Sequence, residues 1–236
     1  VVSCVRAICG SLIANINWSD IVILPREDQG DTVRHALAGN RWKGRDALSH
    51  SRRIDLVRYI ANQLLAREGE ARFVFFHVDA DRRWSDGRPE ACENGTKFRD
   101  LIARNVRIQL QGALEKMDRS SELDALVSRL HLVVPCTMIE SWLYQSTTRA
   151  AELCRTRSCA GAHAAQYQAW ESDRTLLDEV AQLKSRSDIH CLLDADKTTL
   201  AEALPVEAMR QVGRSFAATV DAVGEDGALL NALGRY

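Results

Sequence analysis

The chain has 236 residues, of which 46% are hydrophobic and 27% are charged, so it is long enough to bury a full core. Its 31 basic and 32 acidic residues give a net charge of −1, which excludes a global basic field for a nucleic-acid partner. No apolar stretch is long enough to span a bilayer, so we expect no membrane partner.

Short β-branched and aromatic runs alternate with helical patterns. In chain order we predict a helix at 1–15, a strand at 20–25, a helix at 51–66, a strand at 73–78, a helix at 96–117 and a strand at 131–135. This alternation predicts an α/β fold with a mainly parallel sheet flanked by helices.

The chain beyond Pro135 has no convincing strand pattern. Apolar residues recur at helical spacing over 174–184, 197–204, 206–222 and 226–234, and we interpret 189–196 as a helix end or turn. We therefore expect an α/β core at 1–146 and a helical C-terminal region at 147–236 packed on that core.

Seven cysteines are an odd number, and none form a compact CxxC pair. This usage argues against a secreted disulfide framework and predicts a reducing cytoplasm, with most cysteines as small core residues. Cys154, Cys159 and His163 lie near one another in the sequence, but their spacing does not match a usual zinc site.

Asp79 and Asp81 follow the apolar run FVFFHV directly. Ligands of open parallel sheets bind at the carboxyl ends of the strands, and two carboxylates there suit Mg²⁺ or Mn²⁺. The structural alternative is that Asp79 caps the next helix while Asp81 pairs with Arg82 or Arg83. His77, within the same run, is most simply a core histidine.

A local basic surface is predicted at 41–58, where six basic residues and two acidic ones give a net charge of +4. A solvated loop and helix face is an equally good interpretation of this stretch. If the chain binds nucleic acid, the candidate contacts are Arg41, Lys43, Arg45, Arg52, Arg53, Arg82 and Arg83.

Three classes of enzyme place an acidic pair after a strand. A haloacid-dehalogenase-type phosphatase follows the pair with Gly and Thr, whereas this chain continues with Arg82, Arg83 and Trp84, so that class is excluded. A nucleotide-sugar glycosyltransferase, which holds a metal on a diphosphate, stays open. The third class is the Toprim fold, which binds metal for phosphodiester chemistry.

The segments IVILPREDQG, FVFFHVDADRR and LVVPCTMIESWLYQ, with helices between them, resemble an uncharacterised bacterial family of Toprim-like proteins. That family is related to the overcoming-lysogenization-defect (OLD) type nucleases. The matching positions are Asp79, Asp81, Glu140, Trp142, Lys197 and Phe216.

The resemblance implies a Mg²⁺- or Mn²⁺-dependent nuclease acting on DNA or RNA in the cytoplasm. Asp79, Asp81 and Glu140 would be the metal ligands, and Lys197 would neutralise charge on a phosphate. It also implies bacterial antiviral defence beside an ATPase partner, and it leaves a homo-oligomer open.

One feature of that family is missing from this sequence. The family begins with a strand that carries a Glu-Gly pair, whereas this chain opens on a predicted helix, so we expect the strand to precede Val1 in the native protein. Glu27 is the only early acidic substitute. Without that glutamate, a non-catalytic scaffold subunit becomes the alternative.

Overall fold

The computed structural model describes residues 1–13, 16, 47–65, 72–79, 91–157, 162–180, 182–212 and 214–234. The strands are β1 (Val74–His77) and β2 (Leu130–Val133). The helices are α1 (Val2–Leu12), α3 (Ala47–Leu64), α4 (Ala91–Lys116), α5 (Leu123–Val127), α6 (Glu140–Leu143), α7 (Thr147–Arg155), α8 (Ala164–Ser172), α9 (Leu176–Glu179), α10 (Lys197–Glu202), α11 (Val206–Val212), α12 (Arg214–Glu225) and α13 (Gly227–Leu233). Three short 3₁₀ turns complete this part of the chain: η4 (Ser120–Glu122), η5 (Leu183–Ser185) and η6 (Asp194–Asp196).

β1 and β2 are parallel neighbours, paired in register from Val74 with Leu130 to His77 with Val133. Two of the three predicted strands are therefore confirmed as parallel. The third prediction, at 20–25, lies outside the described residues. In the described part, the fold is mostly helical around a small parallel sheet.

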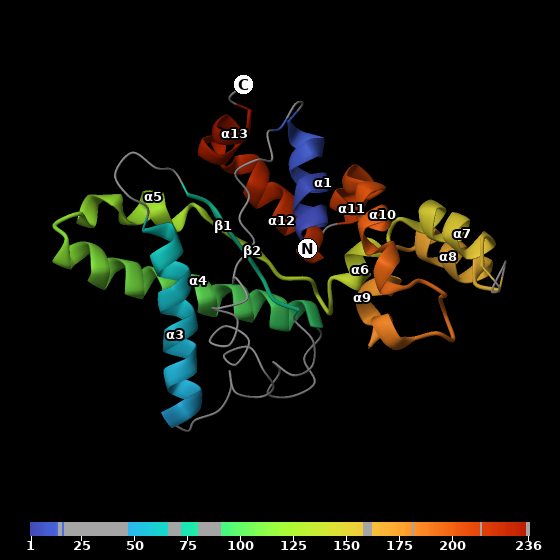
Figure 1. The fold of residues 1–236 in the computed structure, drawn as a ribbon, viewed down its shortest axis with the longest axis horizontal. Coiled ribbons are helices and arrows are strands. Elements are labelled where there is room, and N and C mark those ends of the chain that lie inside the picture. Colours follow the sequence, from blue (N-terminus) through green and yellow to red (C-terminus); the bar gives the residue numbers. More distant parts are fainter. Residues whose placement is uncertain are drawn as a thin grey trace.

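The sheet separates two hydrophobic clusters, because alternate strand residues point to opposite faces. Val74 and Phe76 pack on a cluster built mainly from α3 and α4, which includes Ile60 and Leu110. Phe75 packs on a second cluster formed by α1 and the helices after β2. Figure 1 shows this order, with β1 and β2 crossing the molecule between α3 and α4 on one side and α1 and α12 on the other. The second cluster contains residues from both sides of the expected boundary at residue 146.

The C-terminal helix α13 is connected to the sheet through a buried contact between a histidine and an aspartate. His131 on β2 lies 3.0 Å from Asp226, through Nε2 and Oδ2. The other oxygen of Asp226 accepts a hydrogen bond from the Leu229 amide and so caps the start of α13. Burial lowers the pKa of His131 despite the neighbouring Asp226, so the neutral imidazole is favoured.

Two of the predicted C-terminal helices are wrong in extent. The predicted helix at 174–184 is only the single turn α9, because Val180 is extended and Gln182 is left-handed with φ 53°. The predicted helix at 206–222 is two helices, α11 and α12, because Arg214, where α12 begins, has a φ of 62° that the interior of a right-handed helix does not allow. The turn expected at 189–196 is confirmed, since it contains only extended backbone, turns and η6.

The buried cysteines behave as small core residues. Cys4 and Cys9 of α1 and Cys154 of α7 are buried, and burial raises the pKa of Cys4 and of Cys9 to about 11. Cys136 departs from the expectation of unpaired thiols, since it takes part in a disulfide bond. Cys159, which lies near Cys154 and His163 in the sequence, is outside the described residues. None of the described helices is long and apolar enough to cross a membrane.

Candidate functional site

The chain segments after β1 and β2 meet at the carboxyl end of the sheet. Asp79 lies two positions beyond β1, and its Oδ1 accepts a hydrogen bond of 2.8 Å from the backbone N–H of Ile139. Ile139 is the N-cap residue of α6, and Glu140 is the first residue of that helix. The predicted grouping of Asp79 and Glu140 at one edge of the sheet is therefore present.

Asp79 has a definite structural task in this position. The first N–H groups of a helix have no acceptor within the helix, and the Asp79 carboxylate supplies one for α6. Its Oδ1 also lies 3.0 Å from Nε2 of His77, which belongs to the same face of β1. The second oxygen, Oδ2, has no partner among the described residues, and the side chain is 35% exposed.

Glu140 is a buried carboxylate with one close cation. Its side chain is 6% exposed, and its Oε1 accepts a 2.5 Å hydrogen bond from Nζ of Lys197 at the start of α10. Lys197 also lies 2.9 Å from Oδ1 of Asp194. Desolvation lowers the pKa of Lys197, but the hydrogen bonds to Glu140 and Asp194 and the charges of these two carboxylates together outweigh it, so its net pKa is raised.

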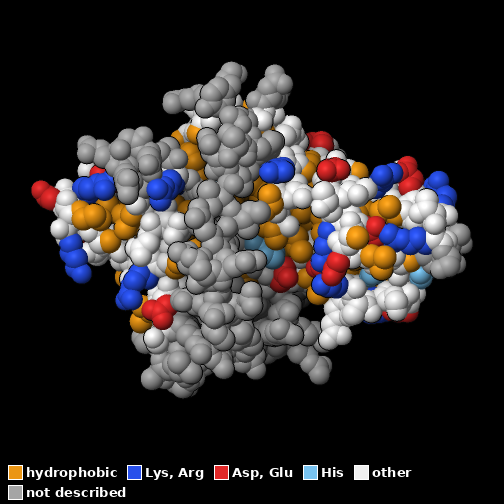
Figure 2. All heavy atoms as spheres, viewed as in Figure 1, with side chains coloured by type: hydrophobic (Ala, Val, Ile, Leu, Met, Phe, Trp, Pro, Cys, Tyr) orange, Lys and Arg blue, Asp and Glu red, His pale blue; other side chains and the backbone are white. Residues whose placement is uncertain are grey.

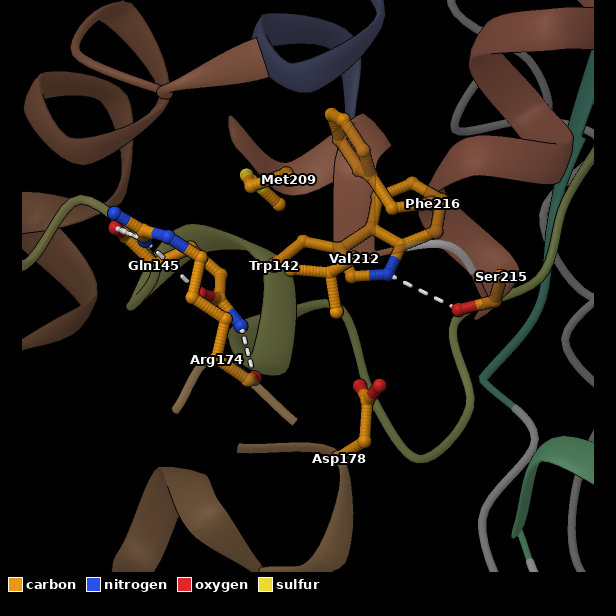
Figure 3. A pocket seen from close by; sticks show the side chains of 8 residues that line it. All are labelled: Trp142, Gln145, Arg174, Asp178, Met209, Val212, Ser215 and Phe216. Carbon is orange, nitrogen blue, oxygen red and sulfur yellow. Dashed lines mark hydrogen bonds between the residues drawn. The ribbon is translucent and has the colours of Figure 1, made fainter. Parts of the chain in front are cut away.

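A second contact joins the short helix α6 to α12. Trp142 and Phe216, both buried, pack edge to face with ring centroids 5.1 Å apart. Figure 3 shows the Trp142 indole pointing between α6 and α12, with its N–H directed at the hydroxyl of Ser215. That hydroxyl also accepts the N–H of Cys136 in the segment after β2. These bonds fix α6, and with it Glu140, against the C-terminal helices.

Figure 3 also shows a pocket lined by Trp142, Ser215 and Phe216 together with Asp178, Met209 and Arg174. Burial raises the pKa of Asp178, whose Oδ2 lies 3.4 Å from the guanidinium of Arg214. The Arg174 guanidinium is directed away from Asp178, to the backbone and side-chain oxygens of Gln145. This pocket is a neighbour of the strand-end site and contains none of the predicted metal ligands.

Several predicted site residues lie outside what the structure describes. Asp81 does so, as do the predicted nucleic-acid contacts Arg41, Lys43, Arg45, Arg82 and Arg83, and also Glu27. Arg52 and Arg53 belong to α3, but their side chains are not among the described ones. On the face drawn in Figure 2, basic and acidic side chains of the described residues are interspersed.

Sequence reasoning missed two participants. His77 was expected in the core, yet its side chain is 23% exposed and its Nε2 contacts the Asp79 carboxylate. Residues two positions apart in extended backbone point to the same side, and this spacing is the signal that pairs them. Asp194 was not among the predicted site residues. Its position three residues before Lys197, at the start of a helix, is the signal for that ion pair.

The metal prediction depends on residues beyond those described. Within the described ranges, no three His, Cys, Asp or Glu side chains come close enough to hold a metal ion together. Comparison of the chain with protein-family models, with curated proteins and with solved structures found no match in any of the three.

Proposed function

We propose that the chain is a Mg²⁺- or Mn²⁺-dependent nuclease of the Toprim type, which hydrolyses phosphodiesters of DNA or RNA. The observation that carries this proposal is the hydrogen bond between Asp79 and the N–H of Ile139. It joins the ends of two parallel strands and gathers two acidic residues where ligands of such sheets bind.

The convergence of distant positions supports the same proposal. Residues that carried the resemblance are scattered along the sequence, yet Glu140 contacts Lys197 and Trp142 contacts Phe216. Glu140 and Trp142 share the single turn α6, whose start is held by Asp79. Five of the six matching positions thus belong to one connected set of contacts, and the sixth, Asp81, lies two positions beyond Asp79.

The chemistry of the described donors suits a hard divalent cation. Asp79 Oδ2 and Glu140 Oε2 are carboxylate oxygens without a described partner, and oxygen is the ligand that Mg²⁺ and Mn²⁺ prefer. The nearby Thr137 hydroxyl is buried and has no described partner either. Asp79, Asp81 and Glu140 would hold the ion. When bound, it would activate water and neutralise charge on the phosphate.

The chain's own residues position these donors. His77 and the Ile139 amide both contact Oδ1 of Asp79, and Oδ2 has no partner among the described residues. Lys197 forms an ion pair with Glu140 and so compensates the charge of this buried carboxylate. With Asp194 as its second partner, Lys197 stays in place beside the site.

A non-catalytic scaffold subunit is the second candidate, and one observation favours it. Glu140 is already neutralised at 2.5 Å by Lys197, and Asp79 already anchors α6, so both acidic residues have structural tasks. In this case the chain would act by assembling with a partner such as an ATPase, and with no cation at the strand ends.

Cleavage of nucleic acid separates these candidates. We expect the wild-type chain, with an intact native N-terminus, to cleave DNA or RNA with Mg²⁺ or Mn²⁺. Asp79→Asn and Glu140→Gln should abolish cleavage, because each removes a ligand charge but keeps a hydrogen-bonding oxygen. Asp194→Asn is the matched control and should stay active, since Asp194 also pairs with Lys197 but is 64% exposed.

Cleavage that survives in Glu140→Gln would refute the proposed ligand set. A wild-type chain that cleaves neither DNA nor RNA with either ion would favour the scaffold subunit. Metal-dependent binding of a nucleotide diphosphate sugar, without cleavage, would favour the glycosyltransferase alternative.

A further inference from the structure

Arg99 of α4 reaches into the junction between β2 and α12. Its Nη2 donates to the carbonyl oxygen of Val134 at 2.9 Å and to that of Ser215 at 3.0 Å. The Thr219 hydroxyl lies 3.4 Å from the same nitrogen. Val134 is the first residue beyond β2, so the guanidinium lies at the carboxyl end of the sheet.

The positive charge of Arg99 has no counter-charge in the described part of the chain. All three of its acceptors are neutral oxygens, and no described carboxylate forms an ion pair with it. Other arginines differ: Arg107, on the same helix, pairs with Asp124 at 2.7 Å, and Arg157 pairs with Asp196. Burial lowers the pKa of Arg99, as expected for a desolvated cation.

A partly buried cation without a counter-charge among the described residues calls for an explanation, because desolvating a charge is costly. The three neutral acceptors use only one of the guanidinium nitrogens, which leaves Nη1 and Nε without a described acceptor. These two nitrogens face different sides of the guanidinium, and either can donate to an oxygen of a phosphate group. The side chain is also partly exposed, so an anion from solvent has access to it.

The position of Arg99 relates it to the strand-end site. The carbonyl oxygen of Ser215 accepts a hydrogen bond from Arg99. The Ser215 hydroxyl accepts hydrogen bonds from the backbone N–H of Cys136 and the indole N–H of Trp142. Trp142 lies on α6 together with Glu140. Ser215 thus connects the Arg99 guanidinium with the helix that carries the proposed metal ligand.

From this geometry we propose that Arg99 binds a phosphate group of a nucleic-acid strand at the carboxyl end of the sheet. The inference rests on the proposed function and deepens it, because it names the residue that recognises the substrate's backbone. A phosphate there supplies the counter-charge that Arg99 lacks among the described residues, and an acceptor for Nη1 or Nε.

The test uses inorganic phosphate and a short single-stranded DNA as probes, without divalent cations, and measures the melting temperature of the full chain. Sodium chloride at equal ionic strength is the reference. Either probe at ten times its Kd should raise the wild-type Tm by roughly 3–6 °C. Arg99→Gln should remove this rise, Arg99→Lys should keep part of it, and Arg107→Gln, on the same helix, should leave it intact.

A second measurement needs no variant. Phenylglyoxal modifies exposed arginines, and phosphate should slow the modification of Arg99 in the wild-type chain, as followed by mass spectrometry of its peptides. An equal rise in Tm for Arg99→Gln and wild type, or no protection of Arg99, would overturn the inference. A response to inorganic phosphate but none to the oligonucleotide would also overturn it.

The two proposals fail in different ways. If Arg99→Gln loses the phosphate response and the wild-type chain cleaves no nucleic acid, the phosphate site is supported and the nuclease proposal is refuted. If the wild-type chain shows metal-dependent cleavage and Arg99→Gln keeps an unchanged phosphate response, the nuclease proposal is supported and the phosphate site at Arg99 is refuted.

Discussion

Lys197→Met is expected to lower the free energy of unfolding by about 3 kcal/mol. This loss corresponds to a decrease of more than about a hundredfold in the equilibrium constant for folding. The substitution leaves Glu140 as a buried carboxylate whose only described cation is gone. Breaking a buried ion pair from one side costs about 3–5 kcal/mol, and the lower end applies because Lys197 is itself 29% exposed. Urea denaturation, analysed by linear extrapolation, measures the loss.

The control for this prediction removes both charges. Glu140→Gln with Lys197→Met leaves no uncompensated charge, so the double variant should recover a large part of the stability lost in Lys197→Met alone. If Lys197→Met instead costs less than about 0.5 kcal/mol, as an ordinary surface substitution does, then Glu140 is not held by this ion pair.

Asp79→Ala is expected to cost about 1–3 kcal/mol, the penalty for leaving a buried hydrogen-bond donor unsatisfied. The donor is the N–H of Ile139, a buried residue at the start of α6. Asp79→Asn keeps an oxygen in the same position and should cost much less, so the Ala and Asn variants separate the structural task of Asp79 from its charge. Equal losses in the two variants would show that Asp79 does not anchor α6 through this bond.

The strongly periodic parts of the fold could be predicted from the sequence. The apolar run at 73–78 predicted β1, and the helical spacing at 51–66 predicted α3, with small errors at the ends of both elements. The short helices of the C-terminal region could not be predicted in the same way. Where they start and stop depends on single residues such as Gln182 and Arg214, whose left-handed backbone no hydrophobic pattern reveals.

The candidate site was predictable in its residues and much less so in its contacts. Asp79 was given a structural alternative as the cap of the following helix, and it does cap a helix, but one 60 residues further along the chain. The ion pair between Glu140 and Lys197 spans 57 residues. Contacts at such separations arise from packing of α6 between the sheet and α10, which local spacing does not encode.

Titration of the chain with Mn²⁺ tests most directly whether Asp79 and Glu140 share one cation. The wild type should bind Mn²⁺, and Asp79→Asn and Glu140→Gln should each weaken binding by at least about tenfold, since each removes a ligand charge. Asp194→Asn should bind as the wild type does. Equal affinity in wild type, Asp79→Asn and Glu140→Gln would contradict the shared site and leave the two carboxylates with their structural tasks alone.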